Sequence, residues 1–181
     1  MDSQTRNIVR KNSCRNHLAA ASAAVINPRR SVSDIFKVTQ LLRNRDPMVR
    51  RGAIDILANV RGKDATNAIT HCLKDTCPQV RAAACQVLGQ MRAQSAKTAL
   101  YDAIHDSDTS VAIHAAEALA LMGDKFGLDQ IKILVARSGN HQRKALQCLN
   151  MLTNQKFHLN EHGLQKAIQW VRPAKKKFFA F

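Results

Sequence analysis

The segment HLNEH, residues His158 to His162, matches the spacing of an inverted zinc-protease motif. In that motif two histidines on one helical face bind zinc, a glutamate acts as the base, and a further carboxylate or histidine completes the ligand set. No Asp, Glu or His follows His162 in the sequence. Asn160 is suited to cap a final helix through Val171, which leaves His158 outside the helix that would hold Glu161. We therefore expect neither a zinc site nor catalysis at this motif.

The cysteines and the other histidines form no convincing ligand set or nucleophile–base pair. The five cysteines are Cys14, Cys72, Cys77, Cys85 and Cys148. Their odd number and the lack of a CxxC pair favour free thiols in a reducing cytoplasm over a disulfide framework. His71 and Cys72 lie near Cys77 in the sequence, but adjacent side chains on a helix diverge, and His114 and Cys85 are expected to pack. The sequence also lacks a glycine-rich phosphate loop. Together these features predict a non-catalytic protein without a metal or cofactor, and the free thiols predict a cytoplasmic location.

The sequence ends on KKKFFAF, which places three rings directly after three cations. These residues are Lys175, Lys176, Lys177, Phe178, Phe179 and Phe181. Pro173 is expected to end the last helix, so residues 174–181 should form a tail. The rings can fold back over the end of the core, or they can enter a partner while the lysines bind acidic groups. Three cations are marginal for membrane anchoring, because each contributes about 1 kcal/mol at an anionic leaflet. We interpret the tail as a docking segment for a protein complex.

The remainder of the chain, which must position these ends, is rich in alanine and aliphatic residues. Of the 181 residues 45% are hydrophobic but only 4% are aromatic, a composition that suits closely packed helices better than sheets. No run approaches the roughly 20 apolar residues of a membrane span. The stretch HLAAASAAVI faintly resembles a signal peptide, but INPRR follows in place of a cleavage site, so we interpret it as a helix. Organelle targeting stays an alternative, because Asp2 is the only acid in the first 33 residues.

The central segment repeats with a period of 31 residues. The strings DPMVRRGAIDILANV, CPQVRAAACQVLGQM and DTSVAIHAAEALALM carry apolar residues at i, i+4 and i+8, which share one helical face. These residues are Val49, Ala53 and Leu57, then Val80, Ala84 and Leu88, then Val111, Ala115 and Leu119. A second block repeats Ile69, Leu100 and Ile131 at the same step. Each unit is therefore predicted to be two helices of about 12 residues, which bury their apolar faces by stacking on the next unit.

This pattern resembles HEAT repeats, specifically the short bacterial type that is also found in the phycobilisome-lyase families. Their D-x-x-x-x-V-R-x-x-A-x-x-x-L-G string is matched in full by Asp75, Val80, Arg81, Ala84, Leu88 and Gly89. The resemblance implies an all-α fold, a short right-handed α-solenoid of about five helix pairs. Three regular repeats would cover residues 46–137, between degenerate capping repeats at 1–45 and 138–173. A bilin-lyase-like chaperone of phycobiliproteins is a remote alternative function.

Arg50 and Arg81 occupy the arginine position of the repeat string, whereas the third unit carries Ala112 there. A guanidinium group can bind phosphate, which is one interpretation of these residues. The resemblance instead implies a structural role, in which each arginine joins neighbouring repeats through the aspartate of the next turn, Asp75 or Asp106. The planar guanidinium suits carboxylates and carbonyl groups at such turns. We expect these four residues to hold the repeats together.

The net charge of +15 is concentrated at the two ends of the sequence. Residues 46–137 hold eleven Lys/Arg against ten Asp/Glu, whereas residues 1–45 hold nine against two and residues 138–181 hold eight against one. The basic residues expected to dock at the N-terminal end are Arg6, Arg10, Lys11, Arg15, Arg29 and Arg30. Such charge attracts anionic partners, although basic tails can also serve solubility alone. An acidic protein or assembly is the first choice of partner, and nucleic acid bound unspecifically by the ends is the second.

The second helices, expected at about residues 64–75, 95–106 and 127–137, should line the concave side of the solenoid. Their outward side chains are predicted to include Asn67, Thr70, His71, Lys74, Thr98, Tyr101, His105 and Lys132. This strip is polar and nearly neutral, and it lacks the row of arginines with which HEAT-like alkylpurine DNA glycosylases bind duplex DNA. Tyr101 is suited to anchor a protein partner, or it is a lone tyrosine on a solvated face. The sequence therefore favours a non-catalytic interaction scaffold or adaptor.

Overall fold

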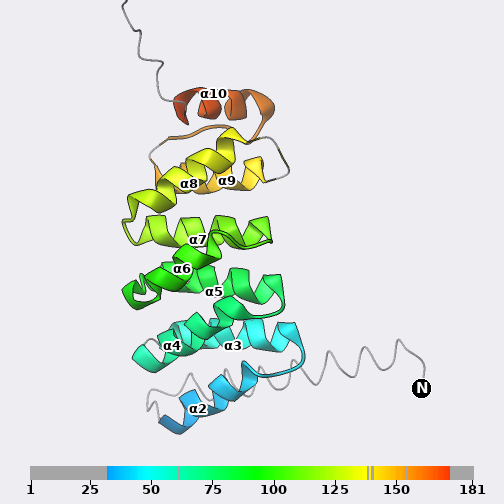
Figure 1. Cartoon of the computed structure of the whole chain (residues 1–181), viewed down its shortest axis with the longest axis vertical. Coiled ribbons are helices and arrows are strands. Elements are labelled where there is room, and N and C mark those ends of the chain that lie inside the picture. Colours follow the sequence, from blue (N-terminus) through cyan, green and yellow to red (C-terminus); the bar gives the residue numbers. More distant parts are fainter. Residues whose placement is uncertain (1–31, 61, 138, 140, 154, 172–181) are drawn as a thin grey trace, which may run out of the picture.

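The chain forms a stack of α-helices, and the computed structural model describes residues 32–60, 62–137, 139, 141–153 and 155–171. The helices are α2 (Val32–Leu41), α3 (Pro47–Val60), α4 (Lys63–His71), α5 (Pro78–Gln90), α6 (Lys97–Ala103), α7 (Thr109–Leu121), α8 (Lys125–Ala136), α9 (Gln142–Leu152) and α10 (Glu161–Val171). They stack in order along the long axis, with α2 at one end and α10 at the other (Figure 1). These residues contain no strand, and the predicted all-α solenoid is confirmed. None of the described helices is long and apolar enough to cross a membrane.

The helices alternate between two roles along the chain. The helices from α3 onward form four pairs, α3 with α4, α5 with α6, α7 with α8 and α9 with α10. We call the earlier member of each pair the first helix and the later member the second helix. The helix α2 precedes the first of these pairs. Short 3-10 turns continue α4 (η1, Cys72–Lys74) and precede α6 (η2, Gln94–Ala96). A first helix to pair with α2 would fall within residues 1–31, outside the described part. The first helices α3, α5 and α7 pack against one another far more extensively than the second helices α4, α6 and α8 do, whereas at the C-terminal end α8 and α10 pack at least as extensively as α7 and α9.

The 31-residue register places its apolar positions in the core. The valine, alanine and leucine positions of the first helices α3, α5 and α7 are at most 1% exposed, and Ile69, Leu100 and Ile131 of the second helices are fully buried. Burial of each large aliphatic side chain contributes about 1.5–3 kcal/mol. The helix α7 contributes Leu119 to the core that it shares with α5 and Ile113 to the core that it shares with α9. Each repeat is therefore stabilised by its neighbours in the stack.

Two glycines allow neighbouring helices to approach closely. A Cβ atom at Gly89 of α5 would lie 2.7 Å from the Cα atom of Ala118 of α7. A Cβ atom at Gly127 of α8 would lie 2.5 Å from the carbonyl oxygen of Ala116 of α7. Since no real side chain fits at such distances, the missing Cβ sets how closely α7 packs against both of its neighbours.

Two second helices differ in length from their predicted ranges. The helix α6 ends at Ala103 rather than near residue 106, because backbone hydrogen bonds of the i to i−3 type tighten its final turn. The helix α8 begins at Lys125, before the predicted residue 127. The side chain of Asp124 caps it there by accepting the amide of Phe126 at 2.9 Å.

Candidate functional site

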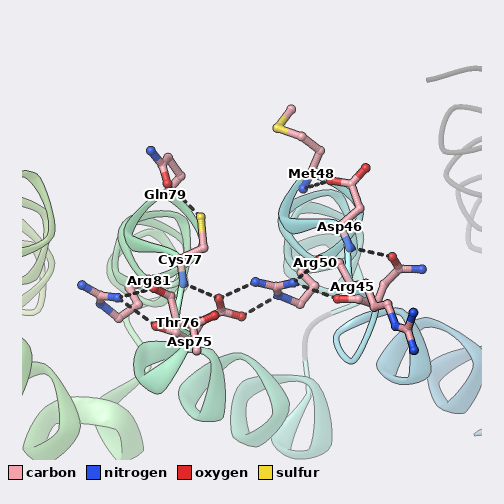
Figure 2. A network of polar contacts seen from close by, with 10 residues as sticks. Arg45, Asp46, Met48, Arg50, Asp75, Thr76, Cys77, Gln79 and Arg81 are labelled. Carbon is pink, nitrogen blue, oxygen red and sulfur yellow. Dashed lines mark hydrogen bonds and ion pairs between the residues drawn. The ribbon is translucent and has the colours of Figure 1, made fainter. Parts of the chain in front are cut away.

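A series of charge-assisted hydrogen bonds links the turns at the start of successive first helices (Figure 2). Arg50 of α3 donates from Nε and Nη2 to the two carboxylate oxygens of Asp75, each at 2.7 Å. Its Nη1 donates to the carbonyl oxygens of Asn44 and Arg45, at 2.8 and 3.2 Å. Asp75 also accepts the amide of Cys77 at 2.8 Å, at the start of α5. One guanidinium group therefore joins the turn before α3 to the turn before α5.

Arg81 of α5 repeats this arrangement one unit later. Its Nε and Nη2 donate to Asp106 at 2.7 and 2.8 Å, and its Nη1 donates to the carbonyl oxygen of Asp75 at 2.8 Å. The hydrogen bonds from Arg81 lower the pKa of Asp106, and for Asp75 the bonds from Arg50 and a backbone amide outweigh the effect of burial and also lower the pKa. The side chains of Arg50 and Arg81 are only 11% and 15% exposed. Their donors are therefore directed into the fold and not towards a phosphate ligand.

The arginine series stops at α7. Ala112 stands at the arginine position and is buried, and Arg137 stands 31 residues after Asp106, where an aspartate would be needed. A different contact links α7 to α9, in which the Lys144 Nζ donates to the Ser110 Oγ at 2.7 Å. The last repeats are therefore joined by apolar packing and by separate polar contacts of this kind rather than by a bidentate ion pair.

The eight residues predicted to face outward from the second helices are called the second-helix face here. Asn67, His71, Lys74, Thr98 and His105 are exposed, whereas Thr70, Tyr101 and Lys132 are half-buried. Thr70, His71 and Lys74 line a groove of about 430 Å³ between α4 and α6. His71 and Lys74 also line a groove of about 320 Å³ between α2 and α4. The other five residues line neither groove, and the concave curvature of this side stays a prediction.

Tyr101 does not stand alone on this face. Its hydroxyl donates to Asp124 at 2.5 Å, and the Lys97 Nζ lies 2.6 Å from the same carboxylate. Its ring lies against that of Phe126, with a centroid distance of 5.5 Å. The hydrogen bonds from Lys97 and Tyr101 lower the pKa of Asp124 to about 2. Tyr101 therefore ties α6 to the start of α8, and the partly exposed Phe126 adds a second ring to the surface.

The sequence analysis missed Lys97, Asp124 and Phe126. One signal was available, because an aspartate directly before an apolar helical segment is a preferred N-cap residue. An N-cap at Asp124 would have placed its carboxylate at the end of α8 that lies next to α6. The ring pair could not be read from the sequence, since Tyr101 and Phe126 do not occupy equivalent positions of the repeat.

The HLNEH segment has a structural arrangement. The Asn160 Oδ1 accepts the amide of Gly163 at 2.8 Å and caps α10, and His158 lies before that helix. A Cβ atom at Gly163 would collide with the backbone of His158, which explains the glycine. Glu161 and His162 are exposed. Within the described ranges, no group of three His, Cys, Asp or Glu side chains is arranged to hold a metal ion.

The described cysteines are free thiols, and most of them are buried. Burial raises the pKa of Cys72 to about 11 and the pKa values of Cys85 and Cys148 to about 12. These three thiols therefore stay protonated at neutral pH and are poor nucleophiles. Cys77 is half-buried, and its Sγ donates to the Oε1 of Gln79 at 2.8 Å.

The basic and aromatic residues predicted to dock at the two ends lie outside the described residues. They are Arg6, Arg10, Lys11, Arg15, Arg29, Arg30, Lys175, Lys176, Lys177, Phe178, Phe179 and Phe181. Their docking role stays a prediction from the sequence.

Comparison with known proteins agrees with the repeat register and the stacked helix pairs. No curated protein matches the chain. A family model described as HEAT repeats matches residues 35–120 and, with an overlapping second match, residues 68–150. These matches cover more than half of the chain and include the arginine–aspartate pairs. The chain therefore belongs to the HEAT-repeat family.

Proposed function

We propose that this chain is a non-catalytic interaction scaffold that docks through its second-helix face on an acidic protein or on a multi-subunit assembly. HEAT repeats generally mediate protein interactions. The two bidentate arginine–aspartate pairs fix the relative positions of the repeats, so the grooves between α2, α4 and α6 are formed before any partner binds. A preformed surface loses less conformational entropy on binding than a flexible one.

The basic rim of the groove between α2 and α4 carries the proposal. Arg43, His71 and Lys74 line this groove, and all three are exposed. Asp75 also lines it, but its carboxylate is held by Arg50. The charge that the groove offers to a partner is therefore positive, which favours acidic side chains. Leu42, Ala68 and Cys72 supply apolar surface in the same groove.

The aromatic pair at the other end of the second-helix face supports binding of a protein rather than of a small anion. Phe126 is 40% exposed, and Tyr101 is held in place by its bond to Asp124. Rings that are already fixed contribute apolar contact area at a low entropic cost. A partner that crosses from the α2–α4 groove to this pair would meet cations first and aromatic rings second.

The basic ends of the sequence complete the proposed docking surface. Residues 1–45 and 138–181 carry nearly all of the net charge of +15. Such charge speeds the encounter with an acidic partner and makes the association rate depend on ionic strength. Nucleic acid bound through these same ends is the alternative function, and the location of the charge is the observation that favours it.

The proposed function is tested by quantitative affinity capture of partners with the full chain and two matched variants. Lys74→Glu reverses a charge on the rim of both grooves. Lys63→Glu makes the same change at the first residue of α4, the helix that is continued by the 3-10 turn η1 with Lys74. Lys63 lies outside both grooves, and a glutamate there is compatible with the helix dipole. We expect recovery of an acidic partner to fall by about tenfold with Lys74→Glu and to stay at the wild-type level with Lys63→Glu. Equal recovery with both variants would refute docking at this rim.

A further inference from the structure

A second hollow lies on the side of the first helices, well away from the second-helix face. This first-helix cleft has a volume of about 300 Å³. Its polar lining comes from Arg51 of α3, Gln79 and Gln86 of α5, Asp108 directly before α7, Ser110 and His114 of α7, and Lys144 of α9. Four successive first helices therefore contribute to one cleft, and no residue of the second-helix face lines it.

The floor of the cleft is one face of α5. Gln79, Ala82, Ala83 and Gln86 fall at i, i+3, i+4 and i+7, so the two alanines lie between the two glutamines on the same side of the helix. The repeat register explains why the surface is hollow here. Arg51 occupies the same repeat position as Ala82, one unit before it, and Lys144 lies on α9, two first helices after α5. The long cationic side chains of Arg51 and Lys144 therefore lie on either side of α5. Between its two glutamines, the cleft-lining face of α5 carries only the methyl groups of Ala82 and Ala83.

The acidic groups around the cleft already have partners. Asp108 accepts the amides of Ser110 and Val111, at 2.8 and 3.3 Å, and thereby caps α7. Glu117 lies 3.1 Å from the ring of His114, and this hydrogen bond lowers the pKa of Glu117. Asp108 therefore keeps its negative charge in the lining of the cleft, whereas Glu117 lies outside that lining.

The two cationic side chains of the cleft, Arg51 and Lys144, can still bind a ligand. The Lys144 Nζ donates to the Ser110 Oγ, but an ammonium group has three N–H donors, so a ligand carboxylate can be bound without breaking that contact. Arg51 is offset in part by Asp55, one turn along α3, yet Asp55 does not line the cleft. Arg51 and Lys144 together outweigh the single carboxylate of Asp108 in the lining, so the remaining positive charge favours an anionic ligand group.

The glutamines indicate the shape of the ligand. Seven residues of α-helix span about 10 Å, so the Cα atoms of Gln79 and Gln86 are separated by about that distance along the axis of α5. An extended backbone covers about 10 Å in three residues. A glutamine amide both donates and accepts hydrogen bonds, which matches the N–H and C=O groups of an extended peptide.

We propose that the first-helix cleft binds a short extended segment of a partner protein, in which an Asp or Glu side chain is bound by Lys144. The segment lies along α5 with its backbone over Ala82 and Ala83 and its polar groups against the two glutamines. This interaction uses a different face from the proposed scaffold surface, so the two can be tested and can fail independently.

The test is an NMR titration of the ¹⁵N-labelled full chain with a capped octapeptide of alternating Glu and Ala. The matched control peptide alternates Gln and Ala. We expect saturable shifts of the amide signals of Gln86 and His114, no shift at Thr98, and binding of the Gln peptide that is weaker by about tenfold or more. Absence of saturable binding, equal binding of both peptides, or shifts confined to the second-helix face would each overturn the proposal.

Two pairs of variants assign the binding to the cleft. Ala82→Leu fills the floor of the cleft, and Ala99→Leu places the same side chain in the groove between α4 and α6. Lys144→Gln and Lys125→Gln each remove one exposed or half-exposed charge, but only Lys144 lines the cleft. We expect Ala82→Leu to abolish binding and Lys144→Gln to weaken it by about three- to tenfold, with both controls unchanged.

An effect of Lys144→Gln no larger than that of Lys125→Gln would overturn the proposal even if Ala82→Leu failed to fold. Both glutamine variants change the net charge equally, so their difference excludes a general electrostatic effect. If Lys74→Glu loses capture of the partner and the peptide titration shows no saturable binding, the scaffold surface stands and only the cleft is refuted.

Discussion

Replacement of Arg50 by methionine tests whether the arginine–aspartate pairs hold the repeats together. Methionine keeps much of the apolar stem but removes every donor of the guanidinium group. Asp75 would lose two hydrogen bonds at 2.7 Å, and the carbonyl oxygens of Asn44 and Arg45 would lose theirs. Asp75 would keep only the amide of Cys77 as a partner for its carboxylate among these contacts.

The expected cost follows from the burial of the pair. Removal of one partner from a fully buried ion pair costs about 3–5 kcal/mol, because the other charge is left without compensation. The Arg50 and Asp75 side chains are each 11% exposed, so water can reach the carboxylate and reduce this cost. We therefore expect Arg50→Met to lower the free energy of unfolding by about 2–4 kcal/mol. In a chain of this size that loss lowers the Tm by about 5–15 °C.

Urea unfolding followed by circular dichroism at 222 nm measures this effect. Arg51→Met is the matched control, because the neighbouring arginine is exposed and should change the free energy of unfolding by no more than about 0.5 kcal/mol. Asp75→Asn combined with Arg50→Met should recover part of the loss, with a coupling energy of about 1–3 kcal/mol. If Arg50→Met costs no more than Arg51→Met, the inter-repeat role assigned to these pairs is wrong.

Four further predictions concern packing, pH, the C-terminal tail and nucleic-acid binding. Gly127→Ala should destabilise the chain in urea although alanine favours helices, because its Cβ would lie 2.5 Å from the Ala116 carbonyl oxygen and 2.6 Å from the Ala120 amide nitrogen. The pKa values of Asp75 and Asp106 lie below their usual 3.8 and that of Asp124 is about 2, so protonation favours the unfolded chain. The Tm should therefore fall as pH drops from about 4 towards 2, and by less in Asp124→Asn. Deletion of residues 174–181 should abolish partner recovery without a change in helical content or Tm, whereas a large loss of Tm would indicate that the tail caps the core. Fluorescence anisotropy with duplex DNA and single-stranded RNA should show only weak binding that disappears by about 150 mM salt, and tight binding that is lost in a chain of residues 46–173 would favour the nucleic-acid alternative.

The repeat register could be predicted from the sequence because every unit must bury the same face against its neighbour. Val49, Val80 and Val111 follow that rule and are all in the core. The ends of the helices were harder to predict, since α6 stops early through a local change in backbone hydrogen bonding. Register is set by apolar spacing alone, whereas helix ends depend on individual capping groups such as Asp124.

The candidate surfaces could be predicted only in part. Outward positions such as His71 and Lys74 follow directly from the core positions, because a helix has one fixed geometry. The bond from Tyr101 to Asp124 and the cleft over Ala82 depend on contacts between different repeats. A hollow arises where small side chains on one helix lie between long ones on its neighbours, and the distance between those helices is set by packing rather than by sequence spacing.

The central claim, that the second-helix face is a protein-docking surface, is tested most directly by hydrogen–deuterium exchange of the full chain with and without its captured partner. We expect slower exchange on binding across α4 with η1 and across η2 with α6, and little change in α9 and α10. The Lys74→Glu chain should lose this protection, whereas the Lys63→Glu chain should retain it. A stable complex whose exchange is unchanged between residues 63 and 106 would contradict the claim.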